Sequence, residues 1–266
     1  MMDFSVKDFN VRLRTITILE ASIAIIVAIF LSIYLYDFIG FQNDEFYTII
    51  FDVLIMAFFA VACIGTRGFT KDVNDAFEIA NIFRILGLSI IYFFFCEILV
   101  GFCVNLGLVF SIDVPHFLLA AGTGFEDPVT LFLGFIAAVF IAPVAEELLF
   151  RGVLFNRLKI MKGAPFGIVV SSLIFGSLHF YGGAPFLHVI TATIFGMLMC
   201  VFYMKYDNIF LNIVVHFIGN LLIYIQDYTP LLTILQIEPF SDFVVWICLF
   251  SVIFVPSYIS YYAIRS

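Results

Sequence analysis

The sequence predicts an all-α membrane protein with about eight transmembrane helices, both termini in the cytoplasm and a polar cavity inside the membrane. Three observations support this fold class. Of the 266 residues, 64% are hydrophobic and only 12% are charged, so the bilayer must be the solvent for most of the chain. Eight apolar stretches are long enough to cross a membrane. The basic residues occupy alternate connections between these stretches, as expected for cytoplasmic loops.

The eight stretches follow one another with short connections. A spanning helix needs about 20 mainly apolar residues, and the stretches cover residues 16–38, 46–65, 84–110, 129–156, 164–182, 186–204, 209–226 and 243–264. The first is too long for the apolar part of a signal peptide and lacks a convincing cleavage site, so it is predicted to be a signal-anchor helix. There is no soluble domain, low-complexity tract or clear internal repeat. Residues 1–266 are therefore predicted to form a single polytopic membrane domain.

The distribution of charge gives the orientation independently of hydropathy. Basic residues precede the first stretch, lie between the second and third, fourth and fifth, and sixth and seventh, and follow the eighth: Lys7, Arg12, Arg14, Arg67, Lys71, Arg84, Arg157, Lys159, Lys162, Lys205 and Arg265. The other connections contain Asp and Glu but no Lys or Arg. Arg151 is the one basic residue outside this pattern. By the positive-inside rule, both termini are predicted to be cytoplasmic.

Composition also excludes some function classes. No basic patch with interleaved aromatic residues is present, so nucleic acid is not expected as a partner, whereas the lipid bilayer is. The five cysteines all fall inside apolar stretches without metal-type CxxC spacing: Cys63, Cys96, Cys103, Cys200 and Cys248. They are predicted to be buried thiols rather than disulfides or metal ligands.

The most informative polar residues lie inside the apolar stretches. They are Glu146, Glu147, Arg151, His179, His216 and Asn220. At 1.5 Å per residue, Glu146 lies about 18 Å from the inner end of its helix, and His179, His216 and Asn220 lie about 22, 13 and 20 Å from theirs. Residues from three helices are thus predicted to share one layer of the membrane. Ionisable side chains are costly at that depth and usually line a cavity or have a partner.

The angular positions separate the two glutamates. Neighbours on a helix point about 100° apart, so Glu146 and Glu147 are not expected to aim at one spot. Glu147 and Arg151 have i, i+4 spacing with the acid first, which favours an ion pair. That pair leaves Glu146 as the free carboxylate. His216 and Asn220, also four residues apart, share one helix face.

These positions predict a hydrolytic site. Glu146 is assigned as general base and holds a water together with His179, while Glu147 and Arg151 support it. His216 and Asn220 donate hydrogen bonds to the oxyanion that develops when the water attacks a peptide carbonyl. In an alternative arrangement, His179, His216 and either Glu146 or Glu147 bind zinc or another divalent metal, and the other glutamate is the base. The HExxH spacing of zincins is absent, and the residues alone do not choose between the two arrangements.

Three motifs in this set resemble a known family. Glu146-Glu147-x-x-x-Arg151, Phe175-x-x-x-His179 and His216-x-x-x-Asn220 are similar to the motifs of the CPBP family of CAAX proteases and bacteriocin-processing enzymes (also called Abi proteins), which includes the type II CAAX prenyl endopeptidases. The resemblance covers roughly residues 129–225. It implies an eight-helix fold with a cavity open to the cytosol and endopeptidase activity on peptide or membrane-associated protein substrates. It carries over the two glutamates, the two histidines and Asn220 as catalytic, with Arg151 in support, and it favours activated water without a tightly bound metal.

The resemblance also suggests a biological setting. The compact chain with short loops looks like a bacterial member in the plasma membrane, acting in peptide maturation or in self-immunity against a bacteriocin. Two rival functions remain open. A transporter or channel would show internal repeats and broken helices at matched positions, which are not visible. A non-catalytic regulator or scaffold that binds a partner membrane protein is the stronger alternative.

Other polar residues are expected to have no catalytic role. Phe175 is predicted to pack against the site, and His188 to lie at the membrane interface. Asp52 is expected near a helix end, where it pairs or reaches the headgroups. Glu97 either faces the cavity or sits protonated between helices, and the sequence leaves both readings open.

Overall fold

The computed structural model describes residues 3–109, 127–181, 186–228, 250–251 and 253–261, and it describes side chains over slightly less of the chain. The described residues form helices with no named strand among them: α1 (Phe9–Thr15), α2 (Ile18–Ile39), α3 (Asp44–Ala62), α4 (Phe69–Ala76), α5 (Ile79–Val109), α7 (Pro128–Phe135), η1 (Ile136–Ile141), α8 (Ala142–Glu147), η2 (Leu148–Phe155), α9 (Asn156–Lys162), α10 (Ala164–Tyr181), α11 (Phe186–Tyr206) and α12 (Ile209–Tyr228). The η segments are π-helical. The predicted all-α fold class is confirmed.

Seven of the eight predicted stretches coincide with helices of the structure. Within the described residues, five helical segments are long and apolar enough to cross a membrane: 18–39, 44–62, 79–96, 128–162 and 186–206. The stretches near 164–182 and 209–226 form shorter apolar helices, 164–180 and 209–225. Half of the eighth stretch, 243–264, lies outside the described residues, and 253–261 is helical. The chain is a multi-pass membrane protein.

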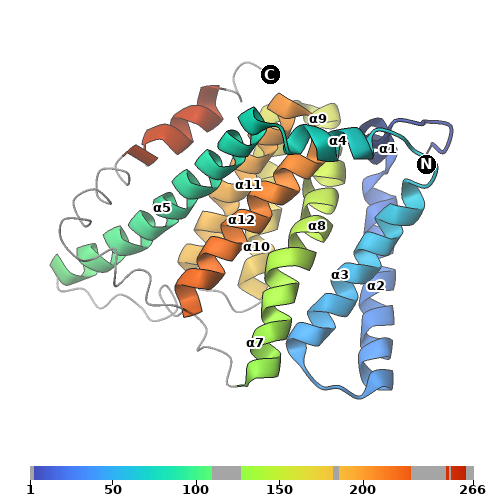
Figure 1. The fold of residues 1–266 in the computed structure, drawn as a ribbon, viewed down its shortest axis with the longest axis horizontal. Helices are drawn as coiled ribbons and strands as arrows, with labels where there is room; N and C mark the ends of the chain where they lie inside the picture. The colour runs from blue at the N-terminus through green and yellow to red at the C-terminus, as the bar shows by residue number, and fades with distance from the viewer. Residues whose placement is uncertain (1–2, 110–126, 182–185, 229–249, 252, 262–266) are drawn as a thin grey trace.

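The short helices gather at one end of the bundle. Figure 1 shows α1, α4 and α9 at the end opposite the start of α7. The guanidinium of Arg12 is fully buried there and donates to the backbone oxygens of Phe4, Val6 and Ala62. Arg157 donates to the carbonyl of Ile16 at 2.7 Å. Basic residues that the sequence assigns to the cytoplasm therefore lie together and fasten the N-terminal segment across that end.

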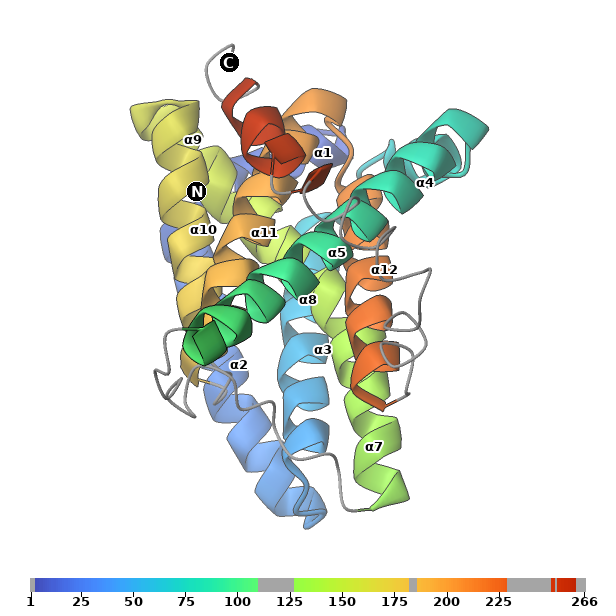
Figure 2. The same ribbon diagram turned by 90° about the vertical axis from the view of Figure 1, so that its left-hand side faces the viewer.

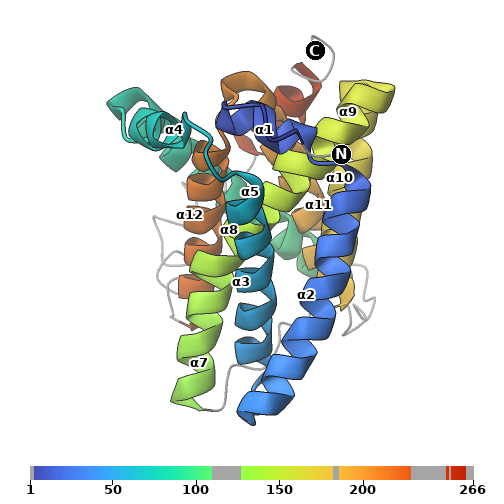
Figure 3. The ribbon, with the colours of Figure 1, turned by 90° about the vertical axis from the view of Figure 1, so that its right-hand side faces the viewer.

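The long helical segment from Pro128 to Lys162 lies at the centre of the bundle. The hairpin of α2 and α3 packs along one side of it (Figure 3), with α3 against α7, η1 and α8. On other sides lie α10, paired with α11, and α12. Figure 2 shows α5 crossing obliquely over α11 and α12. Side chains on this segment can therefore meet groups from several surrounding helices.

Polar side chains fix where α3 and α7 begin. Asn43 caps α3 by accepting from the backbone N–H of Phe46 at 3.1 Å. Asp127 caps α7 in the same way through Val129 and Thr130, and its hydrogen bond from the Thr130 hydroxyl lowers the pKa of the Asp127 carboxyl. The Asn43 amide then donates to the Thr130 hydroxyl at 2.6 Å. The two helices consequently start side by side and run in the same direction.

Two π-helical segments flank α8. A π segment holds more residues per turn than an α-helix and leaves backbone groups that need other partners, which the membrane interior cannot supply. Side-chain amides supply them here. Asn220 on α12 donates to the Ala138 carbonyl in η1 at 2.8 Å. Asn156 donates to the carbonyls of Arg151 and Gly152 in η2, each at 3.0 Å.

Glycines allow α10 and α11 to approach closely, which is a common way for membrane helices to associate. A Cβ at Gly176 would conflict with the Thr193 hydroxyl and lie 2.8 Å from the Val189 carbonyl, whereas a Cβ at Gly87 on α5 would meet open space. We expect Gly176→Ala to destabilise the protein by about 1–3 kcal/mol. Gly87→Ala is the matched control. Thermal unfolding in detergent should show a lower Tm for Gly176→Ala alone, and equal Tm values for the two variants would contradict the close packing.

Candidate active site

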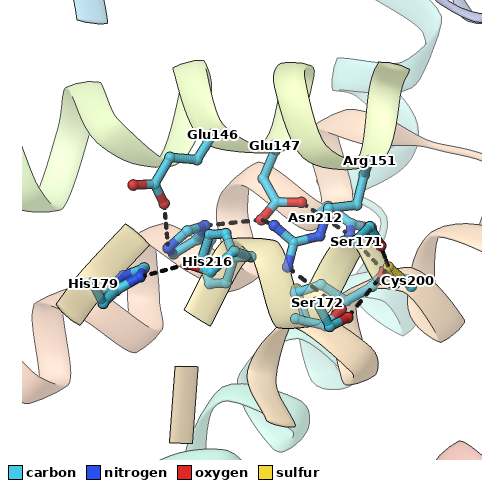
Figure 4. Close-up of polar contacts among 12 residues, drawn as sticks. Glu146, Glu147, Arg151, Ser171, Ser172, His179, Cys200, Asn212 and His216 are labelled. Atoms are coloured by element: carbon cyan, nitrogen blue, oxygen red, sulfur yellow. Dashed lines mark hydrogen bonds and ion pairs between the residues drawn. The ribbon is translucent and has the colours of Figure 1, made fainter. Parts of the chain in front are cut away.

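The two glutamates occupy adjacent positions of α8 but different environments. The Glu147 side chain is completely buried, whereas 28% of the Glu146 side chain is exposed. Figure 4 shows both carboxylates on the side of α8 that faces α12. Only Glu146 is therefore accessible to a substrate, and Glu147 acts within the protein.

The ion pair predicted from the i, i+4 spacing is present. Arg151 donates to Glu147 Oε1 at 2.9 Å, and both side chains are buried. The guanidinium also donates to the Gly196 carbonyl at 3.4 Å and lies 4.6 Å from the centre of the Phe175 ring. A buried ion pair needs such additional partners to offset the loss of hydration. Arg151 thereby fixes the rotamer and the charge of Glu147.

His216 connects the two glutamates. Its Nδ1 lies 2.9 Å from Glu147 Oε1, and its Nε2 lies 3.6 Å from Glu146 Oε2 (Figure 4). An ionised carboxylate can only accept, so Nδ1–H donates to Glu147 and the neutral ring carries its lone pair on Nε2. The two glutamates, expected to point to different places, meet opposite nitrogens of one imidazole. A carboxylate bound in this way orients the ring and increases its basicity.

His179 belongs to the same aromatic cluster. Its Nδ1 donates to the Phe175 carbonyl at 3.0 Å, which also leaves Nε2 as the nitrogen with a lone pair. The Phe175 ring lies 4.8 Å from the His179 ring and 6.0 Å from the His216 ring. Phe175 therefore packs against both histidines, as its predicted packing role requires. Between Glu146 and His179 the described contacts include no hydrogen bond or ion pair; Glu146 faces His216.

Asn220 lies one turn beyond His216 on α12. One hydrogen of its side-chain amide goes to Ala138, as described above. The other amide hydrogen has no acceptor among the described residues and is available for a further hydrogen bond. Its position on the face shared with His216 is the one that the spacing predicts.

Three residues without a predicted role in the site occupy positions that the structure makes clear. Asn212 donates to Glu147 Oε2 at 3.3 Å and to the Met199 carbonyl at 2.9 Å; its position four residues before His216 was the available signal. The ring of His188, which the sequence predicts at the membrane interface, lies 5.4 Å from that of His179. Asp52 is buried in the middle of α3 rather than near its end. The side chain of Glu97 lies outside the described residues.

The metal-binding alternative can be compared with these contacts. Glu147 already accepts hydrogen bonds from Arg151, Asn212 and His216, whereas the hydrogen bonds of the two histidines engage Nδ1 and leave Nε2 of each ring available. Within the described part of the chain, no group of three or more His, Cys, Asp or Glu side chains is arranged to hold a metal ion. A three-residue metal site that includes Glu147 therefore does not fit these contacts, and we derive no step through a metal.

The arrangement is suited to activating water. Glu146 Oε2 and His216 Nε2 are both acceptors, and 3.6 Å is too long for a direct hydrogen bond but suits one water between them. Such a water donates a hydrogen to each acceptor and keeps its lone pairs free. This is the ground state that a general base requires for hydrolysis.

Comparison with known proteins identifies this region independently. Residues 128–222 match the family model for type II CAAX prenyl endopeptidase Rce1-like proteins. The match includes Glu146, Glu147, His179, His216 and Asn220, and it confirms the family resemblance of the motifs. No curated protein and no solved structure is significantly similar to the chain.

Proposed function

We propose that this membrane protein, whose residues 128–222 match the family model for type II CAAX prenyl endopeptidase Rce1-like proteins, hydrolyses peptide bonds with water activated by Glu146. The observation that carries this proposal is the position of His216. Its Nε2 faces the accessible Glu146, while its Nδ1 is held by the buried Glu147. In this proposal the Glu146 carboxylate acts on the water and the substrate, and the Glu147 carboxylate orients the imidazole of His216.

The reaction begins with a water bound to Glu146 and His216. Its oxygen attacks the peptide carbonyl carbon while Glu146 accepts one of its protons. The oxyanion receives a hydrogen bond from the second amide hydrogen of Asn220, a type of contact worth several kcal/mol in a dry site. The C–N bond then breaks, and the proton on Glu146 passes to the leaving amine. The products are a carboxylic acid, which then loses its proton to solvent, and an amine.

The two histidines have distinct roles in this proposal. His216 takes the place beside the water that the sequence assigned to His179, because it is His216 that faces Glu146. We keep His179 in the catalytic set as a second imidazole with its Nε2 lone pair available. Phe175 holds the two rings in relation to each other.

The proposed substrates are peptides or membrane-associated proteins that reach the cavity from the cytosolic side. We place the protein in a bacterial plasma membrane, with leader-bearing peptides, signalling peptides or bacteriocins as the natural setting. The alternative is a scaffold that binds a partner membrane protein and performs no chemistry. The two functions differ in their dependence on the Glu146 carboxylate.

The deciding experiment compares membrane and secreted peptides from cells that produce the wild type or Glu146→Ala at matched abundance. New peptide termini that appear only with the wild type support proteolysis and identify the substrate. Identical peptide profiles, together with a phenotype that Glu146→Ala retains, would favour the scaffold.

We further expect proteolysis by the purified protein to persist after treatment with EDTA or 1,10-phenanthroline. The reason is that the described donors are engaged with one another rather than converging on a metal. Peptide cleavage is measured before and after dialysis against each chelator. A loss of activity that added Zn²⁺ restores would instead support the arrangement in which the two histidines and one glutamate bind metal.

A further inference from the structure

Asp52 is a buried carboxylate that the proposed mechanism does not use. It lies in the middle of α3 with 7% of its surface exposed, on the helix face that also contains Ile55 and Phe59. These two neighbours belong to the same core cluster as Ala145 and Leu148, which flank the glutamates on α8. Asp52 is therefore on the face of α3 that packs toward Glu146.

The described structure gives Asp52 no hydrogen bond and no ion pair. The helix α3 packs against α8, which carries Glu146, a group with the same sign of charge. An ionisable side chain inside a membrane normally has a partner or lines a functional cavity. A carboxylate of this kind, nine-tenths buried beside a proposed catalytic base, is a place for a ligand.

The protein has no positive side chain of its own to offer Asp52. Of its twelve Lys and Arg residues, eleven lie in the segments assigned to the cytoplasmic side. The twelfth, Arg151, is paired with Glu147. With Glu146, Glu147 and Asp52 ionised, these three side chains and Arg151 together carry three negative charges and one positive charge. Such an environment attracts a cation and repels an anion.

We propose that Asp52 is a substrate-binding residue that pairs with a positively charged group of the peptide, a Lys or Arg side chain or an N-terminal amine near the scissile bond. This proposal rests on the proposed peptidase function and defines its substrate class. The cation restores the charge balance of the cavity, while Glu146 remains free for the water. Peptides with acidic residues at the same position are excluded by repulsion from both carboxylates.

The test uses purified protein in phospholipid nanodiscs and a synthetic peptide library with randomised central residues. Cleavage sites are determined by mass spectrometry for the wild type, Glu146→Ala, Asp52→Asn and Asp52→Glu. Asp37→Asn is the matched control, because Asp37 is an exposed aspartate near the end of α2. The kcat/KM values are then measured for two peptides of otherwise identical sequence, one with Lys and one with norleucine at the preferred position.

The wild type should prefer the Lys peptide, and Asp52→Asn should lower that preference by about 30-fold or more, as expected for loss of one partner of a buried charge pair. Asp52→Glu and Asp37→Asn should keep it, and cleavage of the norleucine peptide should change little in any of these variants. The inference is overturned if the wild type shows no preference for cationic sites, or if Asp52→Asn lowers all cleavage equally. Either result leaves the peptidase function standing, provided that cleavage still depends on Glu146.

A third outcome concerns the function itself. If Glu146→Ala and the wild type give the same cleavage pattern, the proposed function fails and the inference fails with it. Should Asp52→Asn not accumulate as folded protein, the Lys and norleucine peptides compared on the wild type alone decide the question. Equal kcat/KM values for the two peptides would then refute a role for Asp52 in substrate binding.

Discussion

Replacing Glu146 with glutamine should lower kcat/KM for peptide cleavage by about 10²–10⁴-fold, the range expected for loss of a general base. Glutamine has nearly the same shape as glutamate, but it cannot accept a proton from water. Because the Glu146 side chain is partly exposed and its described ion-pair contact is with His216 at 3.6 Å, we expect the protein to fold normally. The comparison therefore separates chemistry from structure.

Glu78→Gln provides the control for this measurement, since Glu78 is an exposed glutamate in the connection before α5. Cleavage rates, protein abundance and Tm are measured for both variants in the same nanodiscs. A Glu146→Gln variant with wild-type kcat/KM would remove Glu146 from the mechanism. In that case His216 would be the better candidate for the general base.

The largest effect on stability is expected for Arg151→Met. Glu147 is fully buried, and two described side chains lie within hydrogen-bond distance of its carboxylate: Arg151 and His216. Of these, only Arg151 is always positively charged. Removal of one partner of a buried ion pair leaves the other charge without compensation and typically costs about 3–5 kcal/mol. We expect a lower Tm and lower abundance in the membrane, together with loss of cleavage because His216 is no longer held in place.

A double variant distinguishes these two consequences. Glu147→Gln combined with Arg151→Met removes both charges, so much of the lost stability should return. Cleavage should not return, because a neutral amide does not increase the basicity of His216. If the double variant is as unstable as the sum of the single variants, the two side chains are not coupled as the structure indicates.

The sequence was sufficient to predict most of the fold. Apolar stretches and the placement of Lys and Arg depend on hydration, which acts on each segment separately and is readable from local composition. The pairing of Glu147 with Arg151 was also predictable, because it follows from spacing within one helix. The roles assigned to Glu146, Glu147, His179, His216 and Asn220 remain predictions, and the variants above test those of Glu146 and Glu147.

What could not be predicted depends on contacts between helices. Nothing local distinguishes an aspartate that faces a neighbouring helix from one that reaches the headgroups, so Asp52 was placed near a helix end. The proximity of His188 to His179 could not be predicted for the same reason, since the two residues lie on different helices. The π segments were missed because their wider turns are stabilised by partners elsewhere in the chain, such as Asn220 for Ala138.

Those π segments have a consequence for how the site is encoded. Each accommodates extra chain in a helix that stays continuous, so the direction in which Glu146 and Glu147 point depends on the number of residues between the start of α7 and α8. Adding or removing one residue within Ile136–Ile141 would turn the glutamates by about 100° relative to the preceding part of the helix. The number of residues in this segment, and not their identity alone, therefore sets the orientation of the two glutamates. A single insertion there would remove both carboxylates from the site although neither residue is replaced.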